Sequence, residues 1–297
     1  MDPRLLYTLD PEVWSSLRGT KPVLLHLLEG YVDAASVTRG LAEHLLENCP
    51  SEVVVEFDHD QLHDYRSRRP VMTFDTNQWV GMNAFSLKLY RLTDEDGRYF
   101  LLLHGPEPDT QWMRFAEAIL DIASRLEVSN LVTAQGVPMG VPHTRPTLVT
   151  AHSTDPELAQ GNPIWIDRIQ IPGSWSAMLE YLAGREDRLA MGFVAHVPHY
   201  LAQSTFHQAT LAVLARIKQA TGLALPSDQL EEQLAGNLAA IHTEVSDEAE
   251  FPQILAALEE QYDQLREHPN ESVPSAEEIG AAVERFLAEQ DDDDGSG

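Results

Sequence analysis

A Val-Pro-His tripeptide occurs twice in the sequence, at residues 141–143 and 197–199. Each copy follows an apolar run of a length that is typical of a buried strand. In open α/β sheets, ligands bind beyond the carboxyl ends of the strands, and a proline stiffens the loop in which it stands. A histidine fixed at such a position can act as an acid or a base, or bind an anion. The repeat therefore marks two candidate strand-end loops.

Polar side chains surround both copies and define a candidate cleft. Arg145 and the histidines would hold an anionic group there, with one histidine as acid or base. The alternative is that the histidines are buried and tie rigid loops together through hydrogen bonds. The residues alone leave both interpretations open. The cleft residues are His143, Thr144, Arg145, His152, His196, His199 and Tyr200.

The sequence predicts no metal site, no cofactor and no catalytic residue. His196 and His199 have i, i+3 spacing, but Pro198 between them argues against a regular helix. A His-Glu-x-x-His motif is absent, and the single Cys49 excludes a Cys/His cluster. The Gly-x-Ser-x-Gly elbow, the dinucleotide fingerprint and the phosphate loop are absent as well.

The loop after the first apolar run is a second candidate for ligand or partner binding. It contains Glu29, Gly30 and Asp33 and precedes a predicted helix, whose N-terminus favours anions. Asp33 is suited to cap that helix, and Gly30 to a turn. The two acidic side chains disfavour a phosphate beside them.

Arg66, Arg68 and Arg69 form the basic cluster of the chain. Three guanidinium groups could clamp a carboxylate or a phosphate. The alternative is ion pairing with the acidic C-terminal helices, within one chain or between subunits. The uneven charge distribution favours this second interpretation.

Alternating apolar runs and amphipathic stretches must position these residues. Short apolar runs at 22–28, 52–57, 131–134, 148–152 and 189–195 predict strands, and most read as buried on both faces. A turn at 93–97 joins residues 87–92 to 99–104 in a predicted antiparallel hairpin. The pattern predicts a three-layer α/β sandwich with a mostly parallel sheet, plus a C-terminal helical extension.

Composition divides the chain and limits its partners. We expect an α/β core over 1–225, an acidic helical region over 226–290 and a disordered tail over 291–297. The net charge is −27, and residues 227–297 hold 20 acidic residues against two arginines. The negative electrostatic potential of such a chain repels nucleic acid and anionic membrane. One cysteine, with no visible signal peptide or membrane-spanning run, predicts a cytoplasmic protein.

Three segments together resemble the proteasome assembly chaperone family, in particular its long actinobacterial branch. They are residues 25–35, 135–146 and 192–203, and the resemblance extends over about residues 5–220. The resemblance implies an α/β sandwich of the phosphorylase/hydrolase-like kind. It also implies a homo-oligomer, with a trimer favoured, that binds proteasome subunits or another protein without catalysis. Relatives that act as chaperones often end in a hydrophobic-Tyr-x motif, whereas this chain ends in Asp-Gly-Ser-Gly.

Overall fold

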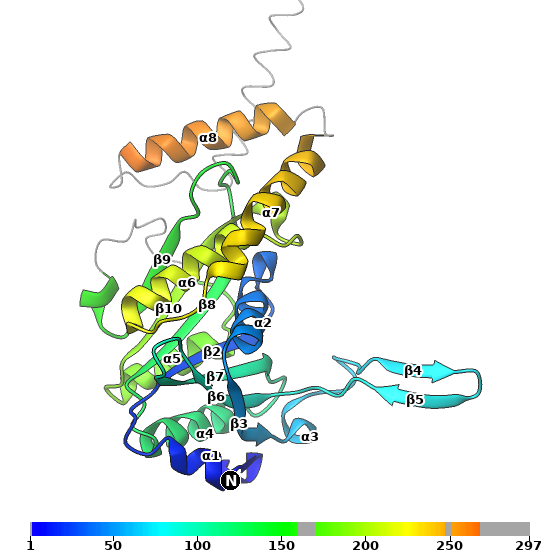
Figure 1. The fold of residues 1–297 in the computed structure, drawn as a ribbon, viewed down its shortest axis with the longest axis vertical. Coiled ribbons are helices and arrows are strands. Elements are labelled where there is room, and N and C mark those ends of the chain that lie inside the picture. The colour runs from blue at the N-terminus through cyan, green and yellow to red at the C-terminus, as the bar shows by residue number, and fades with distance from the viewer. Residues whose placement is uncertain (1, 160–169, 247–250, 268–297) are drawn as a thin grey trace, which may run out of the picture.

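The structure is a computed structural model that describes residues 2–159, 170–246 and 251–267. An eight-stranded sheet runs through it in the order β1-β3-β6-β7-β2-β8-β10-β9 (Figure 1). In this order the strands are β1 (Tyr7–Leu9), β3 (Ser51–Phe57), β6 (Lys88–Thr93), β7 (Tyr99–Pro106), β2 (Val23–Glu29), β8 (Asn130–Met139), β10 (Ala190–Pro198) and β9 (Val149–Ser153).

The centre of the sheet is parallel, and its edges are antiparallel. Strands β7, β2, β8 and β10 run in the same direction. They are the continuous apolar runs of the sequence, as expected for strands covered on both faces. The predicted hairpin is confirmed as β6–β7, and the edge strands β1 and β9 are also antiparallel to their neighbours. The carboxyl ends of the four central strands therefore meet at one edge.

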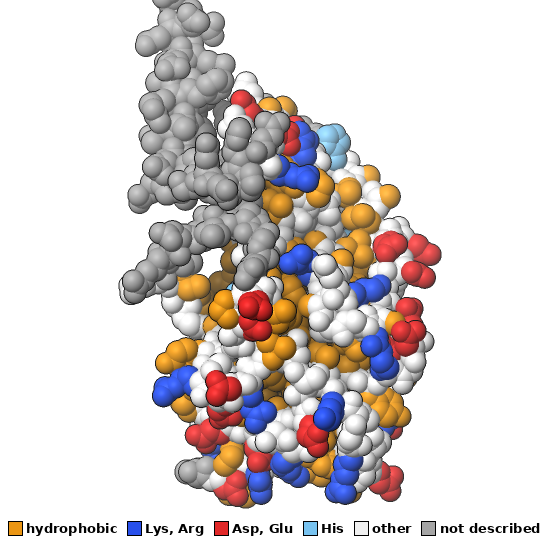
Figure 2. All heavy atoms as spheres, turned by 90° about the vertical axis from the view of Figure 1, so that its left-hand side faces the viewer, with side chains coloured by type: hydrophobic (Ala, Val, Ile, Leu, Met, Phe, Trp, Pro, Cys, Tyr) orange, Lys and Arg blue, Asp and Glu red, His pale blue; other side chains and the backbone are white. Residues whose placement is uncertain are grey.

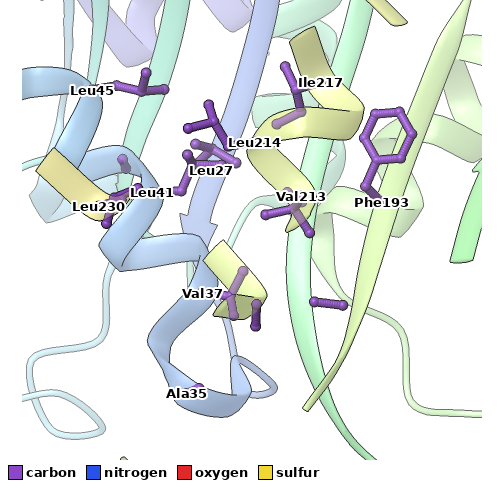
Figure 3. Packing of buried hydrophobic residues seen from close by; sticks show 14 of the residues in the cluster. Leu27, Ala35, Val37, Leu41, Leu45, Phe193, Val213, Leu214, Ile217 and Leu230 are labelled. Atoms are coloured by element: carbon purple, nitrogen blue, oxygen red, sulfur yellow. The ribbon is translucent and has the colours of Figure 1, made fainter. Parts of the chain in front are cut away.

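Helices cover both faces of the sheet, which confirms the predicted three-layer sandwich. One face packs against α1 (Pro11–Ser16), α3 (His59–Leu62), α4 (Trp112–Arg125) and α5 (Trp175–Arg185). The other packs against α2 (Val37–Asn48), α6 (His207–Thr221), α7 (Asp228–Ser246) and α8 (Phe251–Glu267). Figure 3 shows the second interior, where Leu27 of β2 lies between α2 and α6. We refer to these as the α5 face and the α6 face.

Two glycines allow the chain to pass close to the sheet. A Cβ on Gly136 of β8 would lie 2.1 Å from the Ala34 carbonyl oxygen, and one on Gly105 of β7 equally close to that of Ser86. Gly105 also has a φ of +139°, which side chains rarely adopt. The loop that follows β2 can therefore lie directly on the end of β8.

A separate hairpin projects from the body of the molecule (Figure 1). It consists of β4 (Met72–Asp75) and β5 (Gln78–Met82), which pair only with each other among the described residues. Every residue of both strands is exposed. This hairpin was not predicted from the sequence pattern.

The C-terminal region is helical, as predicted, over the part that the structure describes. Helix α7 adds Leu230 and Ile241 to the interior of the α6 face, and α8 adds Phe251. The predicted third helix, which would start near Ser275, and the tail from Asp291 lie outside the described residues.

The surface carries both signs of charge. Figure 2 shows basic and acidic side chains interspersed over the lower body. Among the described residues, every helix is too short or too polar to cross a membrane.

Candidate functional site

The first Val-Pro-His loop is fixed by a tyrosine of the second. The Tyr200 hydroxyl accepts a hydrogen bond from the His143 backbone amide at 2.9 Å and lies 2.9 Å from His143 Nδ1. His143 is only 4% exposed. Burial lowers the pKa of its imidazole, with His242 adding to the effect, and raises the pKa of Tyr200 to about 12. Both groups are thus neutral hydrogen-bonding partners near pH 7.

Helix α8 covers the polar end of the same loop. Arg145 donates two hydrogen bonds to the Asp263 carboxylate, at 3.0 and 2.8 Å, and lies 3.2 Å from Glu259. Thr144 donates to Glu259, and Tyr262 donates to the Pro146 carbonyl at 2.7 Å. The Arg145 guanidinium in turn holds the pKa of Asp263 below its ordinary value. The positive charge of Arg145, which was predicted to bind an external anion, is therefore neutralised by carboxylates of this chain.

Two of the candidate histidines lie on the opposite face of the sheet. His196 Nε2 is 2.8 Å from the Thr150 hydroxyl, and His152 Nδ1 lies 2.8 Å from a Glu180 oxygen on α5. The reason is strand alternation, since β10 directs Phe193, Ala195 and Val197 to the α6 face and the residues between them to the α5 face. His143 and Tyr200, with the exposed His199 packed edge-on against Tyr200, belong to the α6 side. The predicted cleft residues thus form two separate groups.

The group on the α5 face forms a row across four strands. The Thr133 hydroxyl on β8 donates to the His26 carbonyl on β2 at 2.9 Å. Thr133 is in register with Gly192 on β10, and Gly192 with His152 on β9. The His152 ring lies over Gly192, where a Cβ would be 2.2 Å from its Cε1 atom. His26 is fully enclosed and 3.3 Å from the Ser176 hydroxyl of α5. Burial lowers the pKa of His26 to about 3 and that of His196 to about 4, so both remain neutral.

The loop after β2 serves mainly to start α2. Asp33 accepts hydrogen bonds from the Thr38 and Arg39 amides, at 2.8 and 3.2 Å. It therefore caps α2, as predicted, although it lies four residues before the first residue of the helix, Val37. The Ala35 amide donates to the Ala202 carbonyl, just beyond the second Val-Pro-His copy. Glu29 ends β2 beside the start of this loop. This loop and the second Val-Pro-His segment are therefore structurally coupled.

Within the described residues, the arginine cluster pairs with nearby acids rather than with α7 or α8, and its pairing with the rest of the acidic C-terminal region stays a prediction. Arg66 lies 3.5 Å from Asp64, and Arg68 lies 3.4 Å from Asp109. Arg69 forms no ion pair in the part that the structure describes. The arginine that meets the acidic helices is instead Arg145, because the loop after β8 extends beneath α8.

Two predicted residues from different motifs meet at the ends of β2 and β7. Gly30 and Arg68 line one open depression together with Glu107 and Trp112, which the sequence analysis did not single out. Glu107 comes directly after β7, so the strand-end rule that marked the Val-Pro-His loops also applies to it.

The described residues hold no group of three or more His, Cys, Asp or Glu side chains that suits a metal ion.

Three features together define a class of protein: a mixed sheet with a parallel centre, two strand-end loops that hydrogen-bond to each other, and C-terminal helices that cover them. The chain belongs to the PAC2 family, which its sequence matches over residues 27–243. This confirms the resemblance drawn from the strand-end loops.

Solved structures of similar proteins agree with this assignment. A Mycobacterium tuberculosis protein of unknown function is 43% identical, with 89% of this chain and 92% of that chain covered and a TM-score of 0.82. A Corynebacterium glutamicum protein of unknown function is 35% identical, covers 88% and 98%, and has a TM-score of 0.82. A proteasome-assembly chaperone homologue of M. tuberculosis shares the fold at 22% identity, with 78% and 99% covered and a TM-score of 0.72. Comparison with curated proteins gives no match.

Proposed function

We propose that the protein is a cytoplasmic, homo-oligomeric protein-binding module that acts without catalysis, in the manner of proteasome assembly chaperones. The family and the shared fold with a proteasome-assembly chaperone homologue support a binding role. The single observation that carries the proposal is the projecting β4–β5 hairpin, which presents an apolar surface to other molecules.

The hairpin exposes large apolar side chains along both strands. Their exposed area is on the order of 600 Å², at the upper end of what a monomer's largest apolar patch presents. A two-stranded hairpin is also marginally stable in water by itself, so contact with another molecule would stabilise it. The side chains, with their exposed fractions, are Val71 71%, Met72 45%, Phe74 55%, Trp79 64%, Val80 58% and Met82 59%.

The near absence of charge on the hairpin permits a second copy of the chain as the occupant of this surface. Two molecules of net charge −27 repel each other over most of their surfaces. Residues 70–86 contain one charged side chain, Asp75, so repulsion is weakest where the hairpin makes contact. Two such arms supply about 1,200 Å² of apolar surface, the lower bound for a stable interface. We favour a trimer, in which each arm reaches a neighbour.

A ligand-binding enzyme that uses the Val-Pro-His loops is less well supported. Arg145 is engaged by Asp263 and Glu259, and His152 and His196 lie on the other face of the sheet from His143. These positions leave no single cleft in which all the candidate groups could act on one ligand.

Sedimentation velocity on the full chain tests the homo-oligomer. We expect the wild type to sediment at a multiple of 33.1 kDa and Trp79→Ser to shift toward the monomer. Tyr181→Ser is the matched control, because Tyr181 is 65% exposed on α5, outside the hairpin. A wild type that is monomeric at micromolar concentration refutes the homo-oligomer.

The partner class needs a separate experiment. The immobilised full chain should retain purified proteasome subunits of an actinobacterium, and the retention should survive washing at moderate salt. Absence of any retention, with the oligomer intact, refutes the proteasome partner and leaves the homo-oligomer standing.

A further inference from the structure

The depression at the carboxyl ends of β2 and β7 has the features of a binding site. Its volume is about 440 Å³, within the range of small-ligand sites. Gly30 and Tyr31 line it from the loop after β2, and Glu107 and Trp112 from the segment after β7. The Glu107 amide donates to the Glu29 carbonyl at 3.0 Å, so the two segments are directly joined.

Glu107 is a buried carboxyl group with one uncommitted oxygen. Its residue is 9% exposed, and Oε1 accepts a hydrogen bond from the Trp175 amide at the start of α5. Oε2 has no hydrogen-bond partner among the described residues. Oε2 is not among the sealed-off polar atoms, so it is open to the depression, where a bound donor could hydrogen-bond to it.

Gly30 leaves space for such a donor. A Cβ at this position would lie 3.5 Å from Glu107 Oε2. The backbone of Gly30 is outside the left-handed region, so its conformation does not require glycine. What the missing side chain provides is room beside the free oxygen.

The charges around the depression select a cation. Asp64, Glu107 and Asp109 face one arginine, Arg68, whose guanidinium is 3.4 Å from Asp109. When the three carboxyl groups are ionised, this set carries two negative charges in excess, one of which is offset by Arg66, 3.5 Å from Asp64. An anion would meet three carboxylates and an arginine that already has a partner, whereas a cation gains from each carboxylate.

Aromatic side chains at the rim favour a planar cation. The Trp112 indole donates to the Pro108 carbonyl at 2.5 Å, and the Tyr31 hydroxyl donates to the Pro172 carbonyl at 2.7 Å. Both rings are thereby held in place. A guanidinium stacks on such rings and is more weakly hydrated than an ammonium.

We propose that the depression lined by Gly30, Glu107 and Trp112 binds a guanidinium group on an aliphatic chain, with Glu107 Oε2 accepting its hydrogen bond. The group is either the arginine side chain of a protein or a free small guanidine. The proposal is independent of the homo-oligomer, since none of these residues belongs to the hairpin.

Calorimetric titration of the full chain with agmatine tests the site. Loss of a charged hydrogen bond costs about tenfold or more in affinity, so we expect Glu107→Gln to weaken binding by that factor. Gly30→Val should abolish binding by filling the space beside Oε2, and it keeps the test available if Glu107→Gln does not fold. Glu117→Gln, an exposed carboxyl group on α4, is the matched control and should bind like the wild type. No agmatine binding, equal affinity in Glu107→Gln, or tighter binding of cadaverine or phosphate overturns the proposal.

Two further measurements examine the mechanism and the source of the group. Burial raises the pKa of Glu107, and a bound cation favours its ionised form, so agmatine affinity should increase with pH in the wild type and not in Glu107→Gln. A pH-independent wild-type affinity contradicts the role of Glu107. Tighter binding of Gly-Arg-Gly than of agmatine assigns the site to a protein partner, and the reverse order assigns it to a small guanidine. Equal binding of Gly-Gln-Gly and Gly-Arg-Gly overturns both.

Discussion

Removal of the Tyr200 hydroxyl should destabilise the protein through the first Val-Pro-His loop. In Tyr200→Phe, the His143 backbone amide and its Nδ1 atom both lose a partner that lies 2.9 Å away. A hydrogen bond contributes about 1 kcal/mol net, and a buried group left without a partner costs about 1–3 kcal/mol. We therefore expect the free energy of unfolding to fall by about 2 kcal/mol or somewhat more.

Urea denaturation followed by far-ultraviolet circular dichroism measures this loss, with Tyr181→Phe as the control. Tyr181 is 65% exposed, so its hydroxyl is already hydrated and its removal should change stability by less than about 0.5 kcal/mol. A double-mutant cycle with His143→Phe isolates the bond to Nδ1, and its coupling energy should be about 1 kcal/mol. If Tyr200→Phe loses no more stability than Tyr181→Phe, the hydroxyl does not hold the loop and the reasoning is refuted.

Three other variants examine the remaining groups. The pKa of His26 is about 3 in the folded state, so between pH 6.5 and 3 the unfolded state binds one more proton than the folded state. The free energy of unfolding therefore decreases as the pH is lowered from 6.5 to about 3. His26→Leu should flatten this dependence by about 1.4 kcal/mol per pH unit between pH 6 and 4, measured by urea denaturation; an unchanged slope contradicts it. Gly192→Ala should lower the melting temperature by displacing His152, whereas Gly236→Ala on α7, with open space around it, should not lower it; equal effects would count against the contact. Arg145→Gln should accelerate hydrogen exchange in α8 with little change in global stability, and unchanged exchange would show that its ion pairs do not hold the helix.

The sequence was most informative about the centre of the sheet. Strands buried on both faces leave continuous apolar runs, and β2, β7 and β10 were recognised on this basis. The β4–β5 hairpin leaves a weaker signal. Strand β4 alternates apolar and polar residues over only four positions, and β5 follows neither that period nor a continuous apolar run.

The candidate site was predictable only in part. The strand-end rule located the loops that contain His143 and Tyr200, and these loops do contact each other. It could not show that α8 would cover Arg145, since that contact joins residues 118 positions apart. The separation of His196 from His143 follows from the alternation of β10, which fixes the face of each strand residue but becomes usable only when the strand's register is known.

The long sequence separation between the first Val-Pro-His loop and α8 has a consequence for synthesis of the chain. Strand β10 ends at Pro198, whereas α8 begins at Phe251, so the sheet can be completed while α8 has still to be made. At about 5–20 residues per second, this interval lasts several seconds. During it, Thr144 and Arg145 face water instead of Glu259 and Asp263. Because these side chains are hydrophilic, the nascent sheet can stay soluble while this edge is uncovered. An apolar loop at the same position would promote aggregation on the ribosome.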